Sequence, residues 1–292
     1  MNLLEISHLK TSFFTHMGDV KAVDDVSISL ERGETLGIVG ESGSGKSVAM
    51  LSVMRLLSDN GRIVSGEINF GGRDIAKLSE REMEHLRGKQ IGMIFQDPMT
   101  SLNPVFTIGN QLTEMISRHQ GLGRKEAIGR AAEMLSAVMI PSPGERMRQF
   151  PHEMSGGMRQ RVMIAMALCC GPDILIADEP TTALDVTIQA QIIDLMKDLK
   201  KRTGASIILI THDLGVVAGL CDKICVMYAG RIAENGSSSD IFYNPRHPYT
   251  KGLLASVPNP KKLAKERLVP IKGAPPDLLY PPEGCTFAPR CG

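Results

Sequence analysis

One short segment combines glycines, a lysine and a serine in an order that suits phosphate binding. Residues 40–47 read Gly-Glu-Ser-Gly-Ser-Gly-Lys-Ser and match the pattern G-x-x-x-x-G-K-[ST] completely. Glycines let the backbone turn its N–H groups toward a phosphate, and the start of a following helix adds partial positive charge. Lys46 would place its charge on the β- and γ-phosphates, and the Ser47 hydroxyl would ligate Mg²⁺. This segment, the phosphate loop, therefore predicts a nucleotide site.

Two acidic residues follow an apolar stretch that predicts a buried strand. Residues 174–177 run directly into Asp178 and Glu179. Because ligands of parallel sheets bind beyond the carboxyl ends of the strands, Asp178 would reach the Mg²⁺ ion. Glu179 would accept a proton from an attacking water. One acid that merely caps a strand is common, so this interpretation depends on the phosphate loop.

A second glycine-rich helix start lies at residues 155–157. Ser155, Gly156 and Gly157 predict a serine-capped helix whose first N–H groups could bind an anion. Taken alone, an ordinary capped helix without a ligand is the better interpretation. One nucleotide does not need two such starts from one chain, but a γ-phosphate shared between two chains could use both.

The elements that must position these residues alternate between strands and helices. Hydrophobic periodicity predicts an α/β core with a helical stretch from about residue 107 to 170. Ten of the 17 prolines lie between Pro245 and Pro289, which indicates an extended, loop-rich tail. The predicted strands are 26–30, 35–39, 66–70, 91–95, 174–177, 206–210 and 223–227; the helices outside that stretch include 48–57, one after a Ser79–Glu82 capping box, and 186–202.

Composition narrows the class of protein. The 292 residues carry a net charge of +1, which argues against a protein that coats nucleic acid or an anionic membrane. The longest nearly apolar run, 162–170, is far shorter than the roughly 20 residues of a membrane helix. The first residues show no basic leader before an apolar stretch. We therefore expect a cytosolic chain that reaches a membrane only through partners.

Taken together and in this order, the motifs resemble those of the ATP-binding-cassette family over residues 1 to about 245. Residues 155–157 are similar to the family signature, with Met154 and Met158 where leucine and glutamine are usual. Gln96 resembles the glutamine that senses Mg²⁺ and the membrane subunit. His212 resembles the switch histidine that contacts the γ-phosphate.

The resemblance extends to the dimer and to the base of the nucleotide. Residues 182–185 are similar to the loop that crosses the dimer interface, and Phe13 stands where the family has an adenine-stacking aromatic. The family pattern implies that two cassettes close head to tail around two ATP molecules. The implied nucleotide-binding set is Phe13, Gly40, Glu41, Ser42, Gly43, Ser44, Gly45, Lys46, Ser47, Ser155, Gly156, Gly157 and Asp185, with Ser47, Gln96 and Asp178 at Mg²⁺ and Glu179, His212 and Gln96 in catalysis.

The fold that the resemblance implies is α/β. Its core is a P-loop NTPase domain of RecA-like type, with an N-terminal antiparallel β-subdomain and an α-helical subdomain insertion. The ATPase domain would span residues 1–244, with the helical subdomain at about 100–170. Residues 245–292 would form a Pro-rich C-terminal extension, which we expect to be truncated.

Further segments resemble the ATPases of dipeptide, oligopeptide and nickel importers: residues 95–104, 183–191, 246–250 and 284–291. That branch implies a sister ATPase or a second copy, two transmembrane permeases and an extracytoplasmic solute-binding protein. The chain would act at the cytoplasmic face of the cell membrane as a peripheral ATPase that energises peptide uptake, without nucleic acid.

Cys285 and Cys291 resemble the first two of four cysteines that hold an iron–sulphur cluster in this branch. Two thiolates cannot hold a [4Fe–4S] cluster alone, so we expect two loop cysteines without metal here. Nickel or another small solute stays open as the cargo. A soluble cassette ATPase outside transport and an exporter are weaker alternatives, because the chain has a single phosphate loop, no long inserted arms and no fused membrane helices.

Overall fold

The computed structural model describes residues 2–97, 101–182, 185–256 and 270–292. The chain forms two compact units, one from Met1–Leu78 with Leu209–Gly292 and the other from Ser79–Ile208. The first unit therefore joins the two ends of the sequence. The second unit is one continuous stretch of chain.

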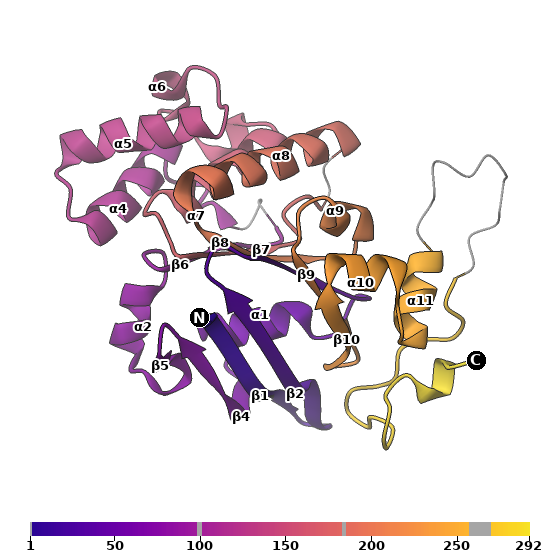
Figure 1. The fold of residues 1–292 in the computed structure, drawn as a ribbon. Helices are drawn as coiled ribbons and strands as arrows, with labels where there is room; N and C mark the ends of the chain where they lie inside the picture. The colour runs from indigo at the N-terminus through magenta and orange to yellow at the C-terminus, as the bar shows by residue number, and fades with distance from the viewer. Residues whose placement is uncertain (1, 98–100, 183–184, 257–269) are drawn as a thin grey trace, which may run out of the picture. The chain divides into compact units, whose positions relative to one another are not determined.

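An antiparallel sheet opens the first unit, in the strand order β2-β1-β4-β5 (Figure 1). Its side chains alternate between buried and exposed along the end of β2, where Val26, Ile28 and Leu30 are buried. This confirms the period of two read from the sequence. The strands are β1 (Asn2–Thr15), β2 (Gly18–Glu31), β4 (Gly61–Phe70) and β5 (Arg73–Asp74), followed by the short helix η1 (Ile75–Lys77).

A buried strand and a helix flank the phosphate loop in the same unit. Strand β3 (Thr35–Val39) is buried throughout and pairs in parallel with β9 (Lys223–Tyr228), which pairs antiparallel with β10 (Arg231–Ser237). Helix α1 (Lys46–Met54) begins directly after Gly45 and ends at a left-handed Arg55. The prediction of 48–57 was therefore displaced, because the loop residues Lys46 and Ser47 already belong to the helix.

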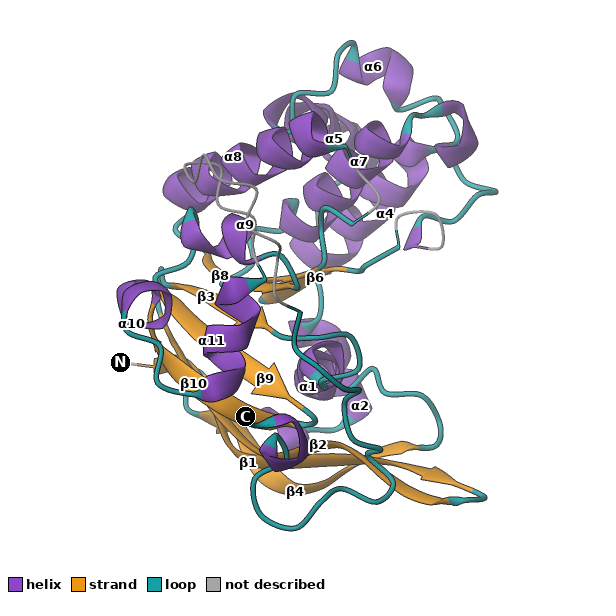
Figure 2. Ribbon diagram, turned by 90° about the vertical axis from the view of Figure 1, so that its right-hand side faces the viewer, coloured by secondary structure: helices purple, strands orange, loops and turns teal. Residues whose placement is uncertain are grey.

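The C-terminal part of the first unit contains more regular structure than the prolines suggest. The helices are α9 (Leu214–Ala218), α10 (Ser238–Tyr243), α11 (Pro248–Ala255) and η3 (Ala288–Arg290). Figure 2 shows α11 alongside β9 and β10. The prediction of a loop was wrong at α11, because Pro248 occupies the first helical position, where proline is favoured, and the His247 side chain caps the helix.

The second unit surrounds two short parallel strands with helices. Strands β6 (Ile91–Ile94) and β7 (Ile174–Asp178) pair in parallel, and β8 (Ser206–Thr211) starts in this unit and ends in the first. The predicted strand at 91–95 is one residue too long, since β6 ends at Ile94, and Phe95 beyond it is 39% exposed. The helices are α2 (Glu80–Leu86), α4 (Ile108–Gln120), α5 (Arg124–Ala137), α6 (Pro143–Arg146), η2 (Pro151–Glu153), α7 (Gly156–Leu168) and α8 (Val186–Thr203).

The helices of this unit follow their sequence signals closely. The capping box of Ser79 and Glu82 is present at α2, and Gly204 ends α8 in the left-handed conformation. Ile108, Leu112 and Ile116 form the buried stripe of α4. Among the described residues, none of the helices combines the length and apolarity needed to cross a bilayer.

Candidate functional site

The phosphate loop is shaped by glycines that no other residue could replace. A Cβ atom at Gly40 would lie 2.2 Å from the carbonyl oxygen of Met227, and one at Gly45 would lie 2.2 Å from that of Ala22. Gly45 also has a φ angle of 94°, in the left-handed region. At Gly40 and Gly45 the backbone of the loop therefore passes so close to its neighbours that a side chain is excluded.

Lys46 lies buried beneath the loop and is bonded to it. Its Nζ donates to the carbonyl oxygens of Gly40 at 2.9 Å and Glu41 at 2.8 Å, and to the Ser44 hydroxyl at 3.3 Å. Lys46 is only 5% exposed, and its ammonium is held within a turn of backbone. A phosphate entering the loop would meet this charge at a fixed position.

The residues present fit a triphosphate and a magnesium ion. Helix α1 begins at the loop, and its N-cap residue Gly45 makes no side-chain hydrogen bond. The start of a helix favours an anion because of its N–H groups and partial positive charge. Ser47 is the second residue of α1 and is half-buried, and Ser42 and Gly43 are exposed. Backbone donors, a buried ammonium and a hydroxyl are the donor set that a magnesium-bound triphosphate requires.

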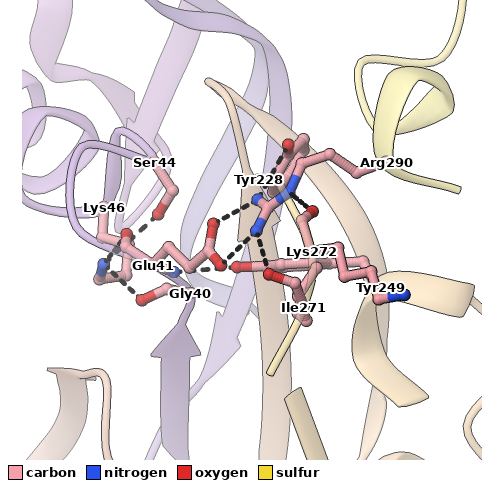
Figure 3. Close-up of polar contacts among 9 residues, drawn as sticks. All are labelled: Gly40, Glu41, Ser44, Lys46, Tyr228, Tyr249, Ile271, Lys272 and Arg290. Carbon is pink, nitrogen blue, oxygen red and sulfur yellow. Dashed lines mark hydrogen bonds and ion pairs between the residues drawn. The ribbon is translucent and has the colours of Figure 1, made fainter. Parts of the chain in front are cut away.

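The second residue of the loop, Glu41, is tied to the C-terminal part of the chain (Figure 3). Its N–H donates to the Tyr249 hydroxyl at 2.9 Å, and its carboxylate accepts from Arg290 at 2.7 and 3.1 Å. No short sequence pattern predicted Tyr249 or Arg290 as a site residue. Both lie in segments singled out for their resemblance, at 246–250 and 284–291, and that was the only signal in the sequence.

Two further predicted residues lie in the first unit. Phe13, on β1, is half-buried, and its ring fills the space that a Cβ on Gly61 would occupy, at 2.7 Å. His212 is exposed and directly follows β8, ahead of the Asp213 side chain that caps α9. The adenine and γ-phosphate roles of these residues stay predictions.

In the second unit, the structure brings Gln96 and Glu179 together from 83 residues apart. Gln96 Nε2 donates to Glu179 Oε2 at 3.0 Å, and the Thr182 hydroxyl donates to the same oxygen at 2.8 Å. Asp178 ends β7 and is buried, whereas Glu179 is half-buried. Glu179 has a φ angle of 46°, a conformation that costs a non-glycine residue about 1 kcal/mol or more. Its carboxylate is held at a defined place by the two donors, and the surrounding structure offsets the backbone strain.

The signature segment forms a second helix start, at the N-terminus of α7. The Ser155 hydroxyl accepts from the N–H of Met158 at 3.3 Å, so this end is capped by its own serine. Ser155 and Gly156 are exposed, and a Cβ on Gly156 would meet nothing within 4 Å. The other glycine, Gly157, faces Ile188 of α8, where a Cβ would lie 3.1 Å from the isoleucine.

Asp185 lies near the signature segment, because it bonds Ile188, the residue that Gly157 faces. Its carboxylate caps α8 by accepting from the N–H of Ile188 at 2.9 Å. The structure therefore brings the start of α8 next to the start of α7 within the second unit. Residues 183–184 of the predicted interface loop, and residues 98–100 of the segment after Gln96, lie outside the described residues.

The two C-terminal cysteines are exposed. Cys285 and Cys291 both fall within the described range 270–292. The described ranges contain no group of three histidine, cysteine or acidic side chains that could hold a metal ion.

Two family models match the chain. The model described as "ABC transporter" matches residues 23–182. The model described as "Oligopeptide/dipeptide transporter, C-terminal region" matches residues 233–292. Between them they cover the phosphate loop, the acid pair and signature segment, and the part of the chain that carries Tyr249 and Arg290.

Curated relatives match over almost the whole chain. An oligopeptide transport ATP-binding protein, OppD of Bacillus subtilis, is 57% identical over 99% of this chain and 81% of its own length. A dipeptide transport ATP-binding protein, DppD of the same organism, is 57% identical over 99% of this chain and 86% of its own length. OppD of Salmonella typhimurium is also 57% identical, over 99% of this chain and 86% of its own length.

Solved structures of similar fold are ATP-binding cassettes. A dimeric post-hydrolysis state of the cassette MJ0796, bound to ADP and Pi, matches with a TM-score of 0.73 and 26% identity, over 80% of this chain and 98% of that one. The protein cbiO1 from Clostridium perfringens, part of the transporter complex cbiONQ, matches with a TM-score of 0.70 and 27% identity, over 83% and 91%. The predicted cassette fold, α/β with an antiparallel β-subdomain and a helical part, is confirmed.

Proposed function

This chain belongs to the ABC transporter family and is an ATP-binding cassette ATPase, and from that premise we propose that it energises the import of peptides. The observation that carries the proposal is the 57% identity, over 99% of the chain, to oligopeptide and dipeptide transport ATP-binding proteins. The match of residues 233–292 to the C-terminal region of such transporters supports the same solute class.

The proposal assigns nucleotide binding to the phosphate loop. Lys46 neutralises the β- and γ-phosphates, and Ser47, Asp178 and Gln96 hold or sense Mg²⁺. The metal offsets phosphate charge and orients the triphosphate; the chain supplies the fixed donors around it. Phe13 stacks on the adenine ring and His212 contacts the γ-phosphate.

Hydrolysis is assigned to Glu179 as the acceptor of a proton from water. The two donors on its Oε2, Gln96 and Thr182, orient the carboxylate. A positioned base of this kind contributes about 10²–10⁴-fold to rate. The remaining acceleration comes from holding the triphosphate in line with the water.

A second cassette completes the proposed site. Ser155, Gly156 and Gly157 of one chain face the phosphate loop of the other, with Asp185 in the interface. The exposure of Ser155 and Gly156 supports this assignment. The second cassette is a sister ATPase or another copy; in a heterodimer, the two ATP sites differ.

We further propose that the ATPase works on the cytoplasmic face of the cell membrane, bound to two permeases, with an extracytoplasmic solute-binding protein delivering the peptide. On this account the chain never touches the solute. Residues 1–244 form the ATPase domain and residues 245–292 an extension of it.

The test is reconstituted transport. The chain is isolated from cells with the permeases that co-purify, placed in lipid vesicles with the solute-binding protein, and supplied with MgATP on the ATPase side. Labelled di- and oligopeptides should accumulate in the wild type and not with Glu179→Gln, while Glu133→Gln, an exposed acid on α5, behaves as wild type. Uptake of Ni²⁺ without peptide uptake would overturn the peptide assignment. Absence of any co-purifying membrane protein would overturn the transport role.

A further inference from the structure

Arg290 reaches the phosphate loop from 249 residues farther along the chain. Its side chain is 5% exposed and forms a two-pronged ion pair with the Glu41 carboxylate, with Nη1–Oε2 at 2.7 Å and Nη2–Oε1 at 3.1 Å (Figure 3). Glu41 is the second residue of that loop. A residue of the C-terminal segment, defined here as residues 270–292, therefore contacts the element that would bind ATP.

Every N–H group of this guanidinium has an acceptor. Besides Glu41, Nε donates to the carbonyl oxygen of Lys272 at 2.9 Å, Nη2 to that of Ile271 at 3.2 Å, and Nη1 to the Tyr228 hydroxyl at 3.2 Å. Arginine has five such donors in a rigid plane, and all are used. The hydrogen bonds that Arg290 donates to the Glu41 carboxylate raise the pKa of Arg290. A lysine could not reproduce this planar set.

Glu41 passes this restraint to the lysine of the loop. Arg290 holds the Glu41 carboxylate. At the same time the Glu41 N–H donates to the Tyr249 hydroxyl at 2.9 Å, and the Glu41 carbonyl oxygen accepts from Lys46 Nζ at 2.8 Å. One residue thus links the C-terminal segment to the ammonium that would meet the phosphates. Loss of the Arg290 contact would free the loop at the residue that helps to place Lys46.

The C-terminal segment is itself fixed to the first unit at several points. The Leu278 carbonyl accepts from the N–H of Lys21 at 3.1 Å, and the Gly284 carbonyl accepts from Arg231 at 3.2 Å. Phe287 is buried against Tyr228 and Tyr249, with ring centroids 5.2 and 5.4 Å apart. Arg290 is therefore presented to the loop by an anchored segment.

We propose that Arg290 is a positioning residue for ATP binding, and that the C-terminal segment acts as a brace that holds the phosphate loop in its binding conformation through Glu41. This inference rests on the proposed ATP-binding function. It gives the C-terminal segment a role in nucleotide binding, separate from any role at the permeases.

The competing explanation is an ion pair that stabilises the fold and does not affect the nucleotide. Buried pairs often cost as much in desolvation as they gain, so stability alone does not separate the two explanations. The dependence of ATP affinity on Glu41 does separate them. If Arg290 acts through Glu41, removal of Arg290 changes ATP affinity only in a chain that still has the glutamate.

The experiment is a double-mutant cycle on the full chain, with ATP and Mg²⁺ titrated into protein in a calorimeter. Arg290→Ala should weaken ATP affinity roughly 5- to 30-fold, and the same change in a Glu41→Ala background should have little further effect. The titration also gives the fraction of chains that bind, so irreversibly unfolded protein lowers the stoichiometry and not the affinity. Reversible unfolding would lower the apparent affinity, so each variant is titrated well below its unfolding temperature. Arg290→Lys should lie between, because the charge stays and the two-pronged geometry is lost.

The matched control is Lys272→Ala. It removes a positive charge from the same segment but leaves the carbonyl that accepts from Arg290, so ATP affinity should equal that of the wild type. Should Arg290→Ala fail to fold, Arg290→Lys and Glu41→Gln carry the test. Unchanged affinity in the folded variants, or an equal loss with and without Glu41, would overturn the brace. Absence of ATP binding by the unaltered chain would instead overturn the proposed function, and the brace with it.

Discussion

The glycine-rich starts of α1 and α7, one in each unit, are built in opposite ways. At the start of α1, Gly45 provides no side-chain cap, and Lys46 lies buried under a loop tied to Tyr249 and Arg290. At the start of α7, Ser155 caps its own helix and stands exposed with Gly156. The first start is restrained by its surroundings, and the second is left open to solvent.

This difference separates two tasks that the motifs alone do not distinguish. The α1 start has its charge, its donors and its restraint within one unit, so it should bind a triphosphate without help from another chain. The α7 start is capped by its own serine and is exposed at Ser155 and Gly156, so it should act only when another chain brings a phosphate to it. Binding should therefore depend on the first start, and turnover on both together with Glu179.

The largest expected effect falls on turnover. Glu179→Gln keeps the hydrogen-bonding shape of the side chain but cannot accept a proton, so ATP hydrolysis should fall by about 10²–10⁴-fold. ATP affinity should stay within a factor of about two, since the phosphate loop is unchanged. Phosphate release checks the predicted loss of hydrolysis, and equilibrium ATP binding on the same preparation checks the retained affinity. Full hydrolysis in this variant would place the base elsewhere and break the division of tasks.

The next effect falls on binding. Lys46→Ala removes a buried ammonium that would bond the phosphates, and charge-assisted bonds of about 1.5–3 kcal/mol imply a loss of affinity of roughly 10- to 150-fold. Lys77→Ala, which removes an exposed lysine of the same unit, is the matched control. Titration of ATP into each variant checks the difference. Equal affinities would show that the loop binds without its lysine.

A smaller effect should appear only in the assembled system. Ser155→Ala removes the cap of α7 and should lower the free energy of unfolding by about 1 kcal/mol. ATP affinity of the isolated chain should not change, whereas ATP hydrolysis by the paired cassettes should fall. Ser79→Ala, which removes the cap of α2, is the control: it should cost similar stability and leave hydrolysis intact. Weaker ATP binding by isolated Ser155→Ala would contradict the comparison.

The sequence predicted the parts of the site that depend on short patterns. Strand β3 and the phosphate loop are contiguous, and the acid pair follows β7 directly, so local periodicity and one motif were enough to find them. The capping box of α2 and the glycine end of α8 are also local signals, and both are confirmed. The sequence did not predict helix α11 because the prolines of this region favour a loop, although one of them, Pro248, starts the helix.

What the sequence could not supply are contacts between distant segments. The hydrogen bond from Gln96 to Glu179 joins residues 83 apart, and the ion pair from Arg290 to Glu41 joins residues 249 apart. Neither pair has a spacing that repeats on a helix or strand, because tertiary packing alone brings them together. Strain at Glu179 is likewise invisible in the sequence, since its φ angle of 46° depends on the surrounding fold.

The smallest effect concerns the far end of the contacts that restrain the α1 start. Tyr249, which accepts from the N–H of Glu41, lies on α11, and Glu234 holds the beginning of that helix by accepting from the N–H groups of Arg246 at 2.7 Å and His247 at 3.0 Å. Burial alone would raise the pKa of Glu234, but the Thr250 side chain, these two N–H groups and the charge of His247 lower it from its ordinary value of 4.5.

A lowered pKa in the folded chain means that the ionised Glu234 stabilises the fold above pH 4.5, and that this contribution disappears as the pH falls through the folded pKa. Because the carboxylate is partly exposed, the contribution should stay below about 1 kcal/mol. The difference in unfolding free energy between wild type and Glu234→Gln, measured in urea at pH 7 and again near pH 3, should be positive at pH 7 and smaller near pH 3. Other carboxylates titrate in both proteins and cancel in that difference. An equal difference at both pH values would mean that Glu234 acts through its shape and not its charge. Acid would then not weaken the restraint on the α1 start through this carboxylate.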